Sequence, residues 1–80
     1  MQRVKTNEVV DGPGPSEKVA TITTSGGIEQ VVLHSSALDS SNYMEIGFLG
    51  YKEDLALIEL PRESASGKWR VWVNKSELAA

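Results

Sequence analysis

The chain of 80 residues contains no cysteine and only one histidine. Without cysteine there is no disulfide framework and no thiolate metal site, and a reducing compartment is favoured, which we take to be the cytoplasm. Zinc bound without cysteine needs more than one histidine, so we expect no metal, and no other cofactor is indicated. His34 is the one candidate general base, with Ser35 beside it and Asp39 nearby in the sequence. Neighbours in sequence rarely face each other in a catalytic geometry, so we expect that the protein is not an enzyme.

Long apolar runs are also missing from the sequence. No stretch approaches the roughly 20 residues that span a bilayer, and no apolar segment of signal-peptide length follows the first residues, so we expect no membrane partner. Eight basic and eleven acidic side chains give a net charge of -3, which opposes a chain-wide attraction to nucleic acid. A chain this small buries a modest share of its surface, which makes self-association an expected source of stability.

The clearest strand is the segment 68–73, which contains both tryptophans and alternates strictly. Trp69, Val71 and Val73 leave one face of such a strand, and Trp72 leaves the other. We predict that the first three close the core, so that Trp69→Ala would cost about 3 to 5 kcal/mol. The sequence alone does not determine whether Trp72 is buried or exposed. The expected cross-strand neighbours of Trp69, Val71 and Val73 are Leu60, Ile58 and Ala56, respectively.

Two hairpins are expected to precede this strand. The segments 18–24 and 28–34 flank a glycine pair, and a two-residue Gly26-Gly27 loop would place Ile22 opposite Val31. The alternative Ser25-Gly26 loop would place Ile22 opposite Glu29 and split the apolar face, so we favour the first register.

The second hairpin joins segments 43–50 and 55–60. A three-residue loop over 52–54 would place Phe48, facing inward, opposite Ile58, and would place Ile46 opposite Leu60. Pro61 then ends the strand, and a longer loop leads to the last one. Counting both hairpins and the tryptophan segment, we predict five strands.

Residues 1–17 differ from the rest because positions 11–15 read DGPGP, which breaks both ladders and helices. We predict a flexible N-terminal arm over 1–17 and a single small β domain over 18–80. Short extra strands at 3–6 and 9–10 are the alternative. No internal repeat is evident.

At the C-terminal end, Asn74 can cap a helical turn, with Glu77 in the capping-box position and Leu78 returning to the core. The segment 67–78 thereby resembles the end of SH3-like barrels, in which a strand reaches a valine, passes through one helical turn and closes with an apolar residue. The resemblance implies a barrel topology and no ligand-binding residue. We therefore predict an all-β fold, a small antiparallel five-stranded SH3-like barrel or rolled sheet with a short C-terminal helical turn. A flatter sheet that dimerises face to face fits the same pattern.

The outward side of the last three predicted strands is too apolar for a purely solvated face. Large exposed apolar patches rimmed by charge mark interfaces, and tryptophan, tyrosine and arginine are the residue types that contribute most interface energy. We therefore expect an interaction module that pairs with a second copy or with another protein. The candidate interface residues are Leu49, Tyr51, Leu57, Lys68, Arg70 and Trp72.

Three alternatives accompany this reading. A small barrel could bind single-stranded nucleic acid through aromatic residues interleaved with Lys68, Arg70 and Lys75, although the net negative charge opposes this, as do Glu45 and Glu59 on the same face. A small enzyme or ligand carrier with a site between protomers is the second alternative. Within one chain, Glu45 and Glu59 would share a face and offer a carboxylate pair for acid-base chemistry, whereas outward charges of this kind ordinarily mark the solvated side of a sheet.

Overall fold

The computed structural model describes residues 2–79 and shows an all-β chain, which confirms the predicted fold class. Met1 and Ala80 lie outside the described residues, so the ends of the predicted arm and of the predicted domain are not covered. The strands are β1 (Arg3–Val4), β2 (Glu8–Asp11), β3 (Glu17–Thr24), β4 (Gly27–His34), β5 (Met44–Glu45), β6 (Gly47–Lys52), β7 (Leu55–Glu59), β8 (Arg70–Asn74) and β9 (Leu78–Ala79). Two 3₁₀ turns, η1 (Ser35–Ala37) and η2 (Lys75–Glu77), complete the regular elements.

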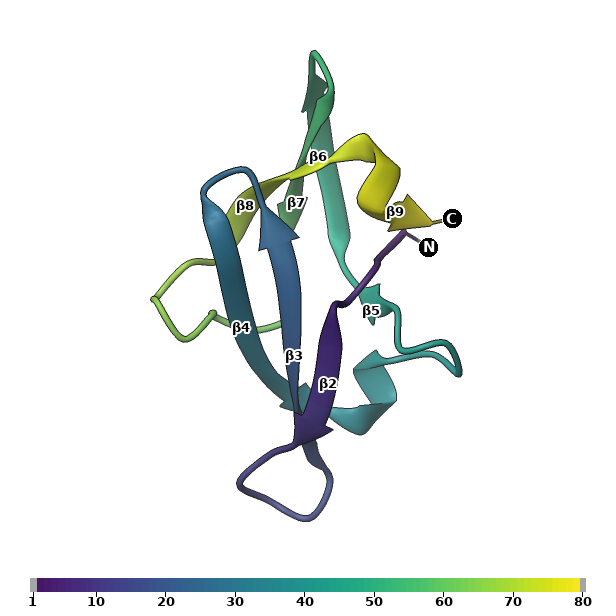
Figure 1. Ribbon diagram of the computed structural model, residues 1–80, viewed down its shortest axis with the longest axis vertical. Helices are drawn as coiled ribbons and strands as arrows, with labels where there is room; N and C mark the ends of the chain where they lie inside the picture. The colour runs from purple at the N-terminus through teal and green to yellow at the C-terminus, as the bar shows by residue number, and fades with distance from the viewer. Residues whose placement is uncertain (1, 80) are drawn as a thin grey trace.

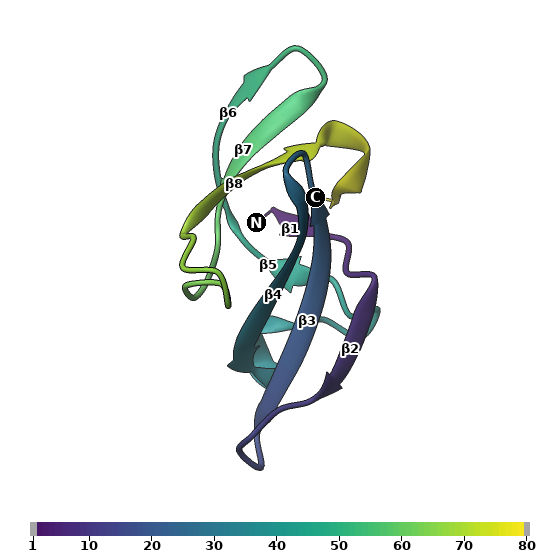
Figure 2. The same ribbon diagram turned by 60° about the vertical axis from the view of Figure 1, so that its left-hand side comes forward.

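The strands form three antiparallel sheets of three strands, with the orders β2-β3-β4, β6-β7-β8 and β5-β1-β9 (Figure 1). The two longer sheets pack against each other, and the short third sheet joins the two chain ends with the middle of the chain (Figure 2). The five predicted strands correspond to β3, β4, β6, β7 and β8. Among the described residues the strands close no barrel, so the five-stranded SH3-like barrel is not confirmed.

The segment predicted as a flexible arm instead contributes β1 and β2. Val4 is fully buried, and β2 is hydrogen-bonded along β3 from Glu8 opposite Thr21 to Asp11 opposite Lys18. The DGPGP stretch does break the chain, but it does so as the turn between these two strands, since Gly12 N donates to the carbonyl oxygen of Glu17 at 2.9 Å. The arm was predicted because a turn and an unstructured segment share the same composition.

The first hairpin uses the register that we rejected. Ser25 and Gly26 form the loop, Thr24 lies opposite Gly27, and Ile22 lies opposite Glu29. Gly27, the first residue after this loop, has a positive φ of 125°. This register turns Glu29 toward the interior, where it is only 8% exposed.

The second hairpin has the predicted pairing at one end only. Phe48 lies opposite Ile58 as predicted, but the loop is the two-residue turn between Lys52 and Leu55. A β-bulge at Leu49 absorbs the extra residue, because the register shifts between Phe48 and Gly50. The bulge changes which side chains of β6 share a face.

The register of the last strand is confirmed at Ile58 opposite Val71 and at Ala56 opposite Val73. Trp69, however, lies before β8 at a bend of the chain and is 52% exposed, so the prediction that it closes the core is wrong. The pairing of Leu60 with Trp69 survives only in the backbone, where Leu60 N donates to the carbonyl oxygen of Trp69 at 2.8 Å. Non-aromatic apolar side chains fill the core, namely Val4, Ala20, Ile22, Val31, Leu33, Met44, Ile46, Ala56, Ile58, Leu60, Val71 and Val73.

The order of elements repeats after forty positions, although no repeat is evident in the sequence. Strand β4 leads into η1 and then Leu38, and strand β8 leads into η2 and then Leu78. His34 and Asn74 cap the two turns in the same way, each accepting a hydrogen bond from the backbone N–H two residues later. The identical residues at this spacing include Gly27 and Gly67, both with positive φ, and the pairs Val31/Val71, Ser36/Ser76 and Leu38/Leu78.

The pairing of the short strands has the same twofold pattern. Val4 and Met44, again forty positions apart, lie opposite each other in antiparallel β1 and β5. Leu78 then lies opposite Val4, and Leu38 forms the equivalent antiparallel bridge to Met44. Each half therefore adds a strand to the other, and the third sheet lies on the pseudo-twofold axis that relates them.

Candidate interaction surface

The outer side of the β6-β7-β8 sheet contains Leu57, Arg70 and Trp72 of the predicted interface residues. Strand β7 alternates strictly, with Ala56 and Ile58 buried in the core and Leu57 directed outward. Leu57 lies between Gly50 of β6 and Trp72 of β8 in one cross-strand row. All three residues are partly exposed. We refer to the row Gly50–Leu57–Trp72 as the Trp72 row.

Charged side chains border this row on one side. Glu59 lies directly opposite Arg70 on the same face, and Arg70 Nε lies 3.3 Å from Glu59 Oε2. Both side chains are largely exposed, so the pair contributes little to stability and remains available to a partner. The predicted grouping of Leu57, Arg70 and Trp72 on one face is therefore what the structure shows.

A shallow hollow of about 360 Å³ adjoins Trp72 on the side of the first hairpin. At this hollow the first hairpin is joined to β8 by a backbone hydrogen bond, in which Ser25 N donates to the carbonyl oxygen of Trp72 at 2.8 Å. Trp72 thus lies between an open sheet face and a hollow with basic residues at its edge, and its side chain is partly rather than fully covered. The hollow is lined by Thr24, Ser25, Gly26, Lys68, Arg70, Val71 and Trp72.

Lys68 is engaged with a buried carboxylate rather than with the Trp72 row. Lys68 Nζ lies 3.5 Å from Glu29 Oε2, and Ser66 Oγ donates to Glu29 Oε1 at 2.6 Å. The hydrogen bonds from Ser66 and then from Ser64 hold the pKa of Glu29 below its ordinary value, because they stabilise the charged carboxylate. The loop before β8 is thereby fixed to β4, with a further backbone bond from Ala65 N to the carbonyl oxygen of Gln30 at 2.8 Å.

Tyr51 leaves the face opposite to the Trp72 row, because it lies opposite the buried Ala56, and Leu49 is the unpaired residue of the bulge. The bulge at Leu49 places Phe48 and Tyr51 on the same side of β6, where their ring centroids are 4.6 Å apart. Lys75 Nζ lies 4.6 Å from the centroid of the Tyr51 ring, a cation–π contact. Phe48 leaves the inner face opposite Ile58, as predicted, but on this edge strand it is 38% exposed and is not part of the core.

The candidate catalytic residues have structural roles. His34 Nδ1 accepts a hydrogen bond from Ser36 N at 3.1 Å and lies 2.9 Å from Ser36 Oγ, so the imidazole caps η1. The carboxylate of Asp39 accepts from the backbone N–H groups of Tyr43 and Ser41 and pairs with Arg3 at 3.0 Å. The bond from Tyr43 N is the main reason that the pKa of Asp39 is lowered. Within residues 2–79 no hydrogen bond or ion pair joins His34 to Asp39.

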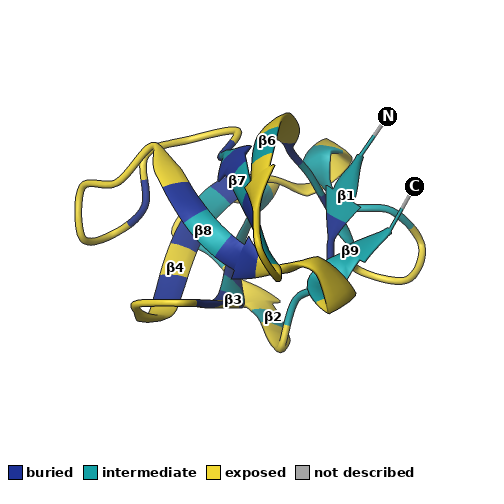
Figure 3. Ribbon diagram, turned by 90° about the horizontal axis from the view of Figure 1, so that it is seen from above, coloured by how far each residue is buried: buried dark blue, intermediate teal, exposed yellow. Residues whose placement is uncertain are grey.

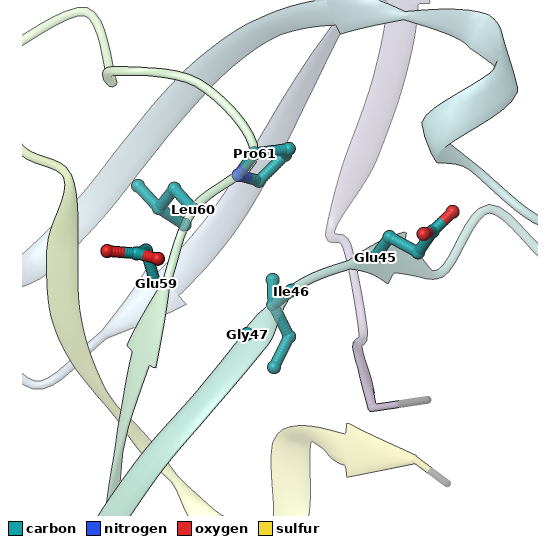
Figure 4. Close-up of a pocket in the computed structure, with 6 residues that line it drawn as sticks. All are labelled: Glu45, Ile46, Gly47, Glu59, Leu60 and Pro61. Atoms are coloured by element: carbon teal, nitrogen blue, oxygen red, sulfur yellow. The ribbon is translucent and has the colours of Figure 1, made fainter.

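Glu45 and Glu59 both border a hollow of about 240 Å³, which is also lined by Leu60 and Pro61. Figure 4 shows their carboxylates at opposite sides of this hollow, with apolar side chains between them. Glu59 is bonded to Arg70, as described above. The two carboxylates therefore do not form the close pair that acid-base catalysis uses.

Within residues 2–79 no three potential ligands among histidine, aspartate and glutamate lie close enough to hold a metal ion. No helix in that part of the chain is long and apolar enough to cross a membrane. A scan against protein-family models, a search of curated proteins and a search of solved structures each find no match to this chain.

Sequence reasoning missed two features of the surface. The Phe48–Tyr51 pair depends on the bulge, and the only local signal for it is Gly47 and Gly50 flanking two apolar residues in an edge strand. The buried Glu29 depends on Ser66, which lies 37 residues away in the sequence. For that contact the sequence offers no local signal.

Proposed function

We propose that this chain is a non-enzymatic protein-interaction module, and that a second copy of the chain is the partner at the Trp72 row. The observation that carries the proposal is an outward row of Leu57 and Trp72 that is partly exposed, beside an exposed Arg70–Glu59 pair. Tryptophan and arginine at the centre and rim of such a patch are the residue types that dominate interface energies.

The charges of this face support a second copy as the partner. One basic and one acidic side chain lie next to each other at the rim, so two identical faces related by a twofold axis can exchange Arg70–Glu59 contacts. The polar candidates for catalysis are each used as a cap, a turn or an ion pair, which supports a non-enzymatic role. A reducing compartment such as the cytoplasm remains our expectation from the cysteine-free sequence.

The test is the mass of the protein in solution over a series of concentrations, for the wild type and for Trp72→Ala. We expect the wild type to associate, and we expect Trp72→Ala to raise the concentration for half-association at least about tenfold, the effect of losing ~1.4 kcal/mol. Trp69→Ala is the matched control, because Trp69 is an exposed tryptophan outside the sheet, and it should leave association unchanged. Thermal unfolding confirms that both variants are folded.

A wild type that stays monomeric at every concentration, or an equal effect of the two tryptophan substitutions, would contradict the proposal. Single-stranded nucleic acid is the second candidate, favoured only by Lys68 and Arg70 beside Trp72. Binding of a mixed oligonucleotide that weakens steeply with salt would favour it. The pairing of these two cations with Glu29 and Glu59 argues for the protein partner.

A further inference from the structure

The free edge of β6 is a second surface of this chain, separate from the Trp72 row. β6 is the outer strand of its sheet, and within residues 2–79 no strand is hydrogen-bonded to its other side. Most of its residues are exposed, as Figure 3 shows. Phe48, Leu49 and Tyr51 are 38%, 44% and 58% exposed. A free edge of this composition is a template for another strand.

From this edge we infer that β6 pairs in antiparallel fashion with β6 of a second copy, around a twofold axis between Leu49 and Gly50. This contact goes beyond the proposed function, because it uses the edge of the sheet and not its outer face. It would join two three-stranded sheets into one sheet of six strands.

The bulge makes the strand self-complementary. Gly47, Gly50 and Lys52 lie opposite outward residues of β7, whereas Phe48 and Tyr51 lie opposite the buried Ile58 and Ala56. Gly47 and Lys52 therefore share one face and Phe48 and Tyr51 share the other, so these four residues present the same faces when β6 is read from either end. In antiparallel strands, directly opposed residues must share a face, and only with the bulge can Phe48 oppose Tyr51 of the second copy.

This register brings the aromatic side chains of the two copies together. Phe48 and Tyr51 already contact each other at 4.6 Å between ring centroids within one chain. Pairing would place the two rings of one copy beside the two rings of the other, on one side of the joined sheet. Cross-strand aromatic pairs are among the most favourable in antiparallel sheets.

The charges along β6 favour the antiparallel orientation. Its first residue, Gly47, lies opposite Glu59, and Glu45 precedes it, whereas its last residue is Lys52. Lys52 has no ion-pair partner among the described residues. In the proposed register, Lys52 of one copy lies opposite Gly47 of the other, whose missing side chain leaves the way open to Glu59. The acidic Glu53 and Asp54 lie in the turn beyond the paired segment.

A lysine in the edge tests the contact. Leu49→Lys changes an exposed side chain at the centre of the twofold axis, and we expect it to raise the concentration for half-dimerisation at least tenfold. Val10→Lys is the matched control, because Val10 is similarly exposed, at 46%, on the outer strand β2 of the other sheet. Lys52→Glu should also weaken the dimer, and its effect should shrink as salt screens the repulsion from Glu59.

Cysteine cross-linking tests the register, since the chain has no cysteine of its own. A mixture of the Phe48→Cys and Tyr51→Cys proteins should form a disulfide-linked dimer under mild oxidation, because directly opposed residues have the spacing that a disulfide needs. Either variant alone, or Phe48→Cys mixed with Lys52→Cys, should cross-link at least tenfold more slowly.

Three results would overturn the inference: a wild type that is monomeric at all concentrations, equal effects of Leu49→Lys and Val10→Lys, or cross-linking without preference for the 48/51 pair. The Trp72→Ala variant separates this contact from the proposed function. If both hold, Trp72→Ala weakens association while the cross-linking of the 48/51 pair persists. If the pair cross-links and Trp72→Ala changes nothing, the edge contact stands and the Trp72 row is not an interface.

Discussion

The two halves of the molecule place opposite kinds of residue at equivalent positions. Glu29 precedes Val31 by two residues in β4, and Trp69 precedes Val71 by two residues before β8. Glu29 is 8% exposed and Trp69 is 52% exposed, the reverse of what their chemistry favours. The twofold scaffold therefore sets the path of the backbone. The loop packed against each half determines which side chain is buried.

The loop before β8 explains the difference. It places Ser66 and Lys68 against β4, so the carboxylate of Glu29 has a hydrogen bond and an ion pair that offset the cost of its burial. The equivalent loop in the first half is the tight turn at Ser25 and Gly26, which offers Trp69 no apolar cover. The outer rows of the two sheets differ in the same way, since Val10–Val19–Val32 occupies the place of the Trp72 row.

The largest effect expected within the comparison is at Glu29. Glu29→Ala removes the acceptor for Ser66 and the partner of Lys68, and we expect a loss of about 1 to 3 kcal/mol in the free energy of unfolding. Chemical denaturation measures this loss. Glu8→Ala, an exposed glutamate in β2, is the control and should change stability by less than about 0.5 kcal/mol. Equal effects of Glu29→Ala and Glu8→Ala would mean that the hydrogen bond and ion pair of Glu29 do not stabilise the fold.

The same residue predicts a pH dependence. The pKa of Glu29 is lower in the folded chain than in the unfolded chain, so its stabilisation is present above the unperturbed value of about 4.3 and is lost as the pH falls through the lower, folded-state pKa. The difference in stability between wild type and Glu29→Ala should therefore shrink in acid. A difference that grows with acidity would contradict this assignment.

A smaller effect is expected at the two equivalent caps. Asn74→Ala removes the acceptor for Ser76 N, which lies 3.0 Å from Asn74 Oδ1, and should cost about 1 kcal/mol. His34→Asn places the cap of the second half into the first, and it should leave stability unchanged or slightly higher, because asparagine is a preferred capping residue. Thermal unfolding compares the two. A clear loss in His34→Asn would show that the two turns are not interchangeable.

The smallest effect is expected at Trp69, where the sequence alone predicts a loss of about 3 to 5 kcal/mol. Because the side chain is half exposed and lies outside β8, Trp69→Ala should change the free energy of unfolding by no more than about 0.5 to 1 kcal/mol. Trp72→Ala, measured beside it, removes a more buried side chain and should cost more. A larger loss of stability in Trp69→Ala than in Trp72→Ala would indicate that Trp69 belongs to the core.

The sequence pattern predicted those features of the fold that depend on residues close together in the sequence. The alternation of β7 and β8 gave the pairs Ile58–Val71 and Ala56–Val73, and the cap at Asn74 was visible in the sequence. For Glu29 the local pattern was misleading, because face burial normally rejects a charged residue and its partners come from a distant loop. The fold repeat was hidden because the twofold pattern preserves backbone path and apolar character at positions such as Val4 and Met44, with few identical residues.

The sequence predicted only part of the candidate surface, because it predicts side-chain direction correctly only in strands that alternate without interruption. Leu57, Arg70 and Trp72 share a face because undisturbed strands alternate, and this places them together from the sequence alone. Tyr51 was assigned to that face by the same rule, which fails beyond Leu49, where β6 contains one extra residue. Lys68 was assigned to it as part of β8, but the strand begins only at Arg70.

The pairing of β1 with β9 gives the chain the connectivity of a ring. Val4 lies opposite Leu78, and both ends of the described chain leave the molecule at the same place (Figures 1 and 2). The segment between Leu38 and Met44 makes the equivalent connection on the other side of the pseudo-twofold axis. Joining the ends and cutting the chain within residues 39–43 would exchange the order of the halves and keep every strand pair. In this fold the strand pairing is therefore the same whichever half comes first in the chain.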